Sequence, residues 1–181
     1  MVAVAAESAR RASVSAVRLR LAAILFCVAL AACALFGPRE RTDEIEPALA
    51  DLRSGGFEFA PDVRFVYDPM TVCDGQSCAD LVVVANRRTI RLARDAFATP
   101  SKLRATLLEI WPRYTMPRHG DIPQLARAAM LVVTDGARAG VTDPEVLREA
   151  QFAYRQLRNQ ATPAERAELP PPESLRPAPA H

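Results

Sequence analysis

Three short segments in the first half of the chain have the spacing of apolar residues that is typical of β-strands. Apolar and polar side chains alternate at residues 63–67 and 89–92, and residues 81–85 form a continuous apolar run rich in valine. Alternation predicts strands with one buried face, and a continuous run predicts a strand buried on both faces. The turn at Asn86-Arg87-Arg88 joins the last two segments in a hairpin. We therefore expect residues 81–85 to form the central strand of a sheet.

The second half of the chain has apolar residues at intervals of three and four, which is the spacing of amphipathic helices. Three stretches carry such an apolar face: residues 100–111, 122–138 and 144–159. Thr99-Pro100 and Asp143-Pro144 are typical helix starts, and Pro112 is expected to end the first of these helices. Together the patterns predict an α+β fold, with a small antiparallel sheet of about three strands packed by about three α-helices.

The N-terminal part of the chain has the regions of an export signal. Four arginines, the last of them Arg20, precede an uncharged apolar run, Leu21–Ala32. This run is well short of the roughly 20 apolar residues that a helix needs to cross a bilayer, and its length suits a signal peptide. The residues at its end, Leu30-Ala31-Ala32-Cys33, resemble the lipobox of bacterial lipoproteins.

The resemblance to bacterial lipoproteins implies that residues 1–32 are removed and that Cys33 is lipidated. The lipid would anchor the chain in the cell membrane on the periplasmic side, and Ala34 after the cysteine implies the outer membrane. Two alternatives stay open. One is an ordinary signal peptide in which Cys33 is incidental. The other is twin-arginine export through Arg10-Arg11, although the residues after this pair match that signal poorly.

The expected organisation has four parts: a signal peptide at 1–32, a tether at 33–45, a single periplasmic α+β domain at 46–168 and a Pro-rich disordered tail at 169–181. The tether is charged and has no clear period, and the tail cannot build a core. Within the domain, a short helix is expected at residues 46–53, with Pro47 in its first turn. The full chain has a formal charge of +2, and the predicted signal peptide contains four arginines and one glutamate. Removing this peptide removes the excess positive charge, so the charge gives no argument for a nucleic-acid partner.

Two cysteines, Cys73 and Cys78, lie within the predicted domain. Export to an oxidising compartment favours a disulfide between them, and Gly75 gives the short loop the backbone freedom that it needs. The bond would hold the entry to the strand at residues 81–85. Metal binding and a redox dithiol are the alternatives. However, neither histidine of the chain lies at ligand spacing from the pair, and the spacing is not Cys-x-x-Cys.

No segment has a strong catalytic signature, and we expect no catalytic cluster, cofactor or metal site. The segment densest in charge and aromatic rings contains Glu109, Trp111, Arg113, Tyr114, Arg118 and His119. These residues could line a groove for an anionic or glycan ligand, in which arginine supplies charge and the rings supply stacking. The alternative is that Trp111 belongs to the core, Glu109 pairs with Arg113 one turn later, and His119 is solvated.

A second group of charged residues consists of Arg87, Arg88, Arg91 and Arg94. It could contact anionic lipid headgroups, or it could be the solvent face of an edge strand, where charge discourages aggregation. Neither group of residues identifies a reaction.

The sequence therefore predicts a lipid-anchored cell-envelope lipoprotein of unknown biochemical activity. Its domain would be a binding or structural module that faces the periplasm, with an envelope protein as the candidate partner. The alternative is an envelope hydrolase that acts on peptidoglycan or lipid and uses the region of Glu109, Arg113 and His119. The sequence leaves open whether the chain is an enzyme.

Overall fold

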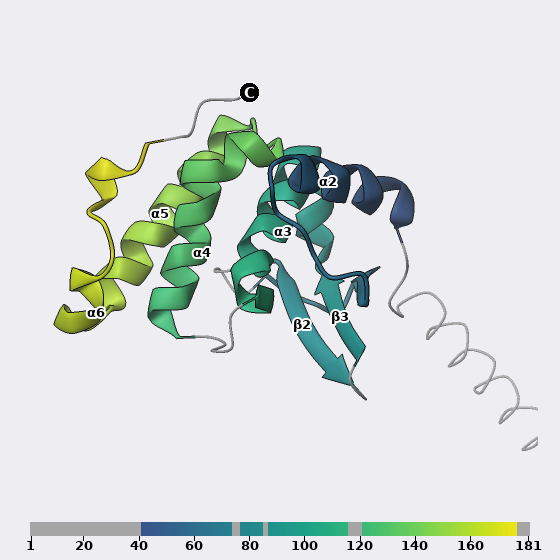
Figure 1. Cartoon of the computed structure of the whole chain (residues 1–181), viewed down its shortest axis with the longest axis horizontal. Helices are drawn as coiled ribbons and strands as arrows, with labels where there is room; N and C mark the ends of the chain where they lie inside the picture. The colour runs from purple at the N-terminus through teal and green to yellow at the C-terminus, as the bar shows by residue number, and fades with distance from the viewer. Residues whose placement is uncertain (1–40, 74–76, 85–86, 116–120, 177–181) are drawn as a thin grey trace, which may run out of the picture. The chain divides into compact units, whose positions relative to one another are not determined.

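A three-stranded sheet lies at one end of the domain, with helices packed against it (Figure 1). The computed structural model describes residues 41–73, 77–84, 87–115 and 121–176, and of residues 84 and 113–115 it describes the backbone only. The predicted signal peptide, Cys33 and most of the predicted tether lie outside this part of the chain. The strands are β1 (Val63–Tyr67), β2 (Ala79–Val84) and β3 (Arg87–Leu92), and their order in the sheet is β1-β3-β2.

The sheet is mixed rather than antiparallel. β2 and β3 form the predicted antiparallel hairpin, with Leu81 opposite Ile90, while β1 runs parallel to β3 on the other side, with Phe65 opposite Ile90. An α+β fold with a small three-stranded sheet is thus confirmed, but the prediction that all strands are antiparallel is wrong. The reason is the connection from β1 to β2, which crosses one end of the sheet and places these two strands on opposite sides of β3.

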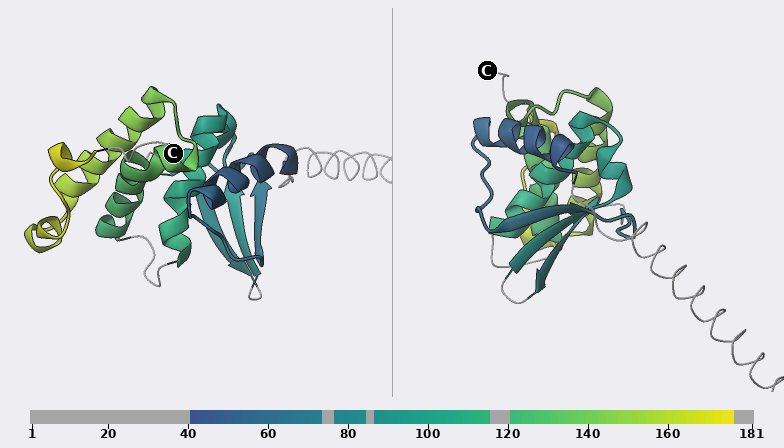
Figure 2. Two further views of the ribbon diagram at one scale, coloured as in Figure 1. Left: turned by 45° about the horizontal axis from the view of Figure 1, so that its top comes forward. Right: turned by 90° about the vertical axis from the view of Figure 1, so that its right-hand side faces the viewer.

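β2 is an edge strand, so the prediction that it is central and buried on both faces is wrong. Val83 exposes 60% of its surface, whereas Ile90 and Leu92 of the central strand β3 are fully buried. The views in Figure 2 show the helices on one side of the sheet. A run of valines indicates a strand but not its neighbours, because strand order depends on residues that are distant in the sequence.

The first described helix, α2 (Thr42–Ser54), begins earlier than predicted. Residues 42–45 are therefore part of this helix and not of the tether, because Ile45 is buried against the core together with Ala48 and Leu52. Pro47 lies inside the helix rather than in its first turn. The Arg104 side chain of the next long helix holds α2 in place, with its guanidinium 2.6 Å from the Asp51 carboxylate.

Helix α3 (Pro100–Thr115) follows a short 3-10 turn, η1 (Arg94–Phe97), and packs on the sheet. Its buried face, which includes Leu103, Leu107 and Ile110, forms the main core with β3 and α2. The helix continues through Pro112, so the predicted end at this residue is wrong. Pro112 cannot donate the backbone hydrogen bond of its turn, but it is itself buried, and packing keeps the chain helical there.

Helices α4 (Ile122–Asp135) and α5 (Pro144–Gln160) confirm the helices predicted at 122–138 and 144–159. The 3-10 turn η2 (Gly136–Ala139) follows α4 directly. Both helices begin with an aspartate cap: the backbone N–H of Gln124 donates to Asp121, and that of Glu145 donates to Asp143. α5 packs along α4, and α4 in turn packs along α3.

The chain after α5 is ordered further than predicted. It forms α6 (Pro163–Ala167) and the 3-10 turn η3 (Pro172–Ser174), and Leu169 between them is buried. The Tyr154 hydroxyl donates a hydrogen bond of 2.5 Å to the Pro170 carbonyl oxygen. The prediction of a disordered tail from residue 169 is therefore wrong for residues 169–176. Residues 177–181 lie outside the described part.

Among the helices of the described residues, none combines the length and the apolar character that crossing a bilayer requires.

Candidate functional site

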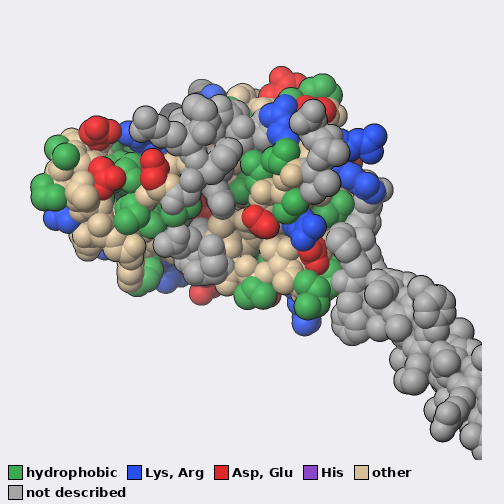
Figure 3. Space-filling model, turned by 90° about the horizontal axis from the view of Figure 1, so that it is seen from below, with side chains coloured by type: hydrophobic (Ala, Val, Ile, Leu, Met, Phe, Trp, Pro, Cys, Tyr) green, Lys and Arg blue, Asp and Glu red, His purple; other side chains and the backbone are tan. Residues whose placement is uncertain are grey.

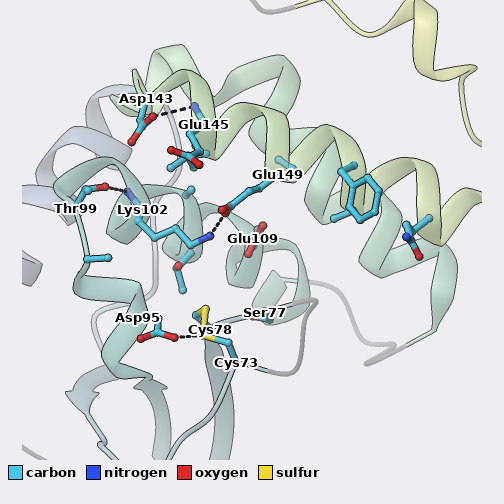
Figure 4. Close-up of a pocket in the computed structure, with 18 of the residues that line it drawn as sticks. Cys73, Ser77, Cys78, Asp95, Thr99, Lys102, Glu109, Asp143, Glu145 and Glu149 are labelled. Carbon is cyan, nitrogen blue, oxygen red and sulfur yellow. Dashed lines mark hydrogen bonds and ion pairs between the residues drawn. A yellow bond between two sulfur atoms is a disulfide. The ribbon is translucent and has the colours of Figure 1, made fainter.

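A groove of about 790 Å³ lies between helices α3 and α5 (Figure 4). Both helices pack on α4, but they hardly contact one another, and the space between them stays open. The Cys73–Cys78 pair and Asp95 close the groove at the sheet. Its volume is in the range of known ligand sites.

Two helical stripes form the long walls of the groove. The side chains that line it recur every three or four residues, so each stripe is one face of a helix. From α3 the wall includes Lys102, Ala105, Thr106 and Glu109, and from α5 it includes Glu145, Val146, Glu149, Ala150, Ala153 and Leu157. The α5 wall continues to Gln160, so that the groove follows the whole helix.

Small side chains leave space between the two walls. Ala105 on α3 and Ala150 on α5 are buried at the base of the groove, and Ala153 lines it further along. An alanine side chain ends at Cβ, so these positions leave space that longer apolar residues would fill. Thr106 adds a polar group to the base: it is 1% exposed, and its hydroxyl has no hydrogen-bond partner within the described part of the chain.

The rim of the groove is acidic at one end. Of the described residues that line the groove, Lys102 is positively charged and five have carboxylate side chains: Asp95, Glu109, Asp143, Glu145 and Glu149. Lys102 forms an ion pair with Glu149 across the gap between α3 and α5 (Figure 4). Asp143 caps α5, and its negative charge also interacts favourably with the positive end of the helix dipole. The lining side chains thus carry a net negative charge.

The other end of the groove is uncharged. It is lined by Phe152, Ala153, Gln156, Leu157 and Gln160 of α5. Phe152 exposes 64% of its surface, one of the highest values among the large apolar residues of the described chain. This ring adds exposed apolar surface to the rim of the groove.

The sulfur atoms of Cys73 and Cys78 lie 2.03 Å apart, at disulfide distance. Cys78 is buried directly before β2, and its carbonyl oxygen accepts a hydrogen bond from the Ala93 N–H after β3. The pair therefore lies at the entry to β2, which is the edge strand and not the central one. The pair also forms part of the groove wall, which the sequence did not suggest.

The structure separates the residues of the predicted groove. Glu109 lines the α3–α5 groove, whereas Trp111 packs edge-to-face on Phe57 and donates a hydrogen bond to the Glu58 carbonyl oxygen. Trp111 therefore belongs to the core side of α3, as the structural alternative expected. The backbone of Arg113 and Tyr114 lies in α3, but their side chains, together with Arg118 and His119, are outside the described part.

Three arginines of the second predicted group, Arg87, Arg88 and Arg91, lie on β3, and Arg94 begins η1. Arg88 forms an ion pair with Asp62 and Arg91 forms one with Asp68, so two of the four positive charges are compensated. Because β3 is central, the prediction that this group lies on an edge strand is wrong. In Figure 3, basic side chains gather at the end of the domain that contains α2 and the sheet.

Sequence reasoning missed the α5 wall of the groove. One signal was available: Phe152 lies on α5 outside the apolar face formed by Val146, Ala150 and Leu157. Within the described ranges, no cluster of His, Cys, Asp and Glu side chains could hold a metal ion.

The chain matches no protein-family model, no curated protein and no solved structure at a significant level.

Proposed function

We propose that this chain is a lipid-anchored cell-envelope lipoprotein whose periplasmic domain binds a partner in the α3–α5 groove. The observation that carries the binding function is the groove itself, which combines an apolar base with a polar rim along a whole helix. This combination is typical of binding surfaces, because the apolar base contributes affinity and the rim fixes orientation. The lipobox resemblance at Cys33 supports the anchor.

The proposed anchor would keep the groove near the membrane. Cys33 is nine positions before Thr42, where α2 begins. Nine residues can span at most about 30 Å, even when fully extended. The partner would therefore be a component of the envelope itself, in or next to the membrane that holds the lipid.

Site-specific photo-crosslinking in intact cells tests the binding function. A photoreactive residue at Phe152, on the rim of the groove, should form a defined adduct with one partner. The matched control is Ala50, which is exposed on α2 and does not line the groove. Ala153→Leu would fill the groove and should remove the adduct, while Ala50→Leu should leave it unchanged. An adduct that forms equally from both positions, or that survives Ala153→Leu, would contradict the proposal.

The envelope hydrolase remains the second candidate, because Glu109 lines this same groove. In that case the groove would bind peptidoglycan or lipid, and Glu109 would act as the acid or base. Glu109→Gln should then abolish hydrolysis and leave binding intact. Release of soluble fragments from purified peptidoglycan, or of fatty acid from phospholipid, measures this activity.

A further inference from the structure

We infer that the groove takes a basic, amphipathic helix of a partner protein, with its cationic half at the Glu145 end and its apolar half at the Phe152 end. This inference rests on the proposed function and names the chemistry of the partner. The shape of the groove and the distribution of charge along it support it independently.

The shape of the groove indicates an elongated ligand. Lining residues extend from Asp143 to Gln160, and a helix of 17 residues such as α5 is about 25 Å long. A compact small molecule would contact only part of this length. Both walls are helical ridges with side chains at intervals of three and four, and such ridges accept the side chains of another helix between them.

The charge of the groove indicates the polarity of that helix. The half near the start of α5 carries Asp143, Glu145 and Glu149, and Glu109 of α3 and Asp95 of η1 also line the groove (Figure 4). Lys102 compensates one of these charges. Lysine or arginine side chains of a partner would complement Asp95, Asp143 and Glu145, whereas an acidic segment would be repelled.

The uncharged half requires apolar side chains. Phe152 and Leu157 offer apolar surface there, and Gln156 and Gln160 add polar groups without charge. A partner helix with leucine-like residues in this half would cover the exposed Phe152 ring.

The test uses the lipidated full-length mature chain in nanodiscs of phosphatidylcholine, which has no net charge. The probe is a fluorescent synthetic helix of about 17 residues, with lysines in one half and leucines in the other. A second peptide replaces each lysine by glutamate, and a third mixes the same lysines and leucines along its length. Fluorescence anisotropy measures binding, and empty nanodiscs give the background.

We expect the lysine–leucine peptide to bind, the mixed peptide to bind more weakly and the glutamate peptide not to bind. The variant Glu145→Gln/Glu149→Gln should weaken binding about fivefold, because it removes two exposed negative charges from the groove. Binding should also weaken as the salt concentration rises. The control Glu46→Gln/Glu58→Gln changes the net charge equally at two exposed sites away from the groove and should leave binding unchanged.

Equal binding of the lysine and glutamate peptides, no binding of either, or equal losses in the two double variants would overturn the inference. A crosslinker at Gln160 should capture the leucine half of the peptide, and capture of the lysine half would overturn the assigned direction. These outcomes are separate from the proposed function. If the groove captures a partner in cells but binds the lysine and glutamate peptides equally, only the inferred chemistry of the partner is refuted. If the groove captures no partner at all, the proposed binding function and the inference are both refuted.

Discussion

The buried tyrosine of α5 gives the most direct test of how the C-terminal segment is held. Tyr154 has no exposed surface, and its ring packs with Ala126 and Ala129 of α4 and with Leu169. Its hydroxyl donates to the Pro170 carbonyl oxygen at 2.5 Å. Tyr154→Phe removes this hydrogen bond and leaves the ring in place.

The size of the effect follows from the environment of the acceptor. A neutral hydrogen bond contributes about 1 kcal/mol to the free energy of unfolding. Pro170 is partly exposed, so water can replace the lost donor, and no buried acceptor is left without a partner. We therefore expect Tyr154→Phe to lower the free energy of unfolding by about 1 kcal/mol, whereas Tyr154→Ala, which also creates a cavity, should lower it by about 3–5 kcal/mol.

Because of the same hydroxyl, the free energy of unfolding of the wild-type protein depends on pH in the alkaline range. Burial raises the pKa of Tyr154 above its ordinary value of 10.0, and the positive charge of Arg158 opposes this shift in part. The folded chain therefore binds the phenol proton more tightly than the unfolded chain. This stability is fully present below about pH 10 and is lost as the pH rises through the folded-state pKa.

Urea unfolding of the wild type and Tyr154→Phe, followed by circular dichroism at neutral pH and above pH 10, measures both effects. The difference between the two proteins should shrink at alkaline pH, because the wild type loses the contribution that the variant lacks. Tyr67→Phe is the control, since the Tyr67 hydroxyl has no hydrogen bond within the described part of the chain. A difference that stays constant or grows with pH would refute the reasoning, as would an equal loss in the control.

Three further predictions concern the anchor, the disulfide and a close backbone contact. Cys33→Ala should abolish incorporation of labelled palmitate, while the circular dichroism spectrum of the domain stays unchanged; equal labelling of wild type and variant would refute lipidation at Cys33. Replacing Cys73 and Cys78 by serine should lower the free energy of unfolding by about 2 kcal/mol, and thiol labelling of the unreduced, denatured wild type should find neither cysteine free. Gly55→Ala would place a Cβ atom 2.6 Å from the Arg138 carbonyl oxygen, so thermal unfolding should show a loss of about 1–3 kcal/mol, and an unchanged melting temperature would contradict this.

Local signals explain which elements could be predicted. α5 combines a capping aspartate, a proline in the first turn and an apolar face, and all of these lie within one short stretch of sequence. The end of α3 and the order of the strands could not be predicted in the same way. Burial of Pro112 keeps α3 helical, and the position of β1 beside β3 depends on pairs such as Val63 and Arg88, which are distant in the sequence.

The groove could not be predicted for a similar reason. Its two walls come from residues that are far apart in the chain, as Lys102 and Glu149 show, and the space between them exists because both helices pack on a third one. Glu109 was identified as a candidate from its own segment, but nothing near it in the sequence indicated that α5 would be its neighbour. The exposed ring of Phe152 was the one local irregularity that pointed to this surface.

The parallel pairing of β1 and β3 also determines the order in which the protein can fold. The hairpin of β2 and β3 closes a very short loop, whereas each pair between β1 and β3 closes a long one that includes all of β2. Local contacts form first, because closing a long loop costs more chain entropy. The disulfide shortens the long loop by only five residues, which reduces its closure cost by about 0.2 kcal/mol. β1 precedes the other two strands in the chain but stays unpaired until the hairpin has formed, so the first strand of the sheet is the last to join.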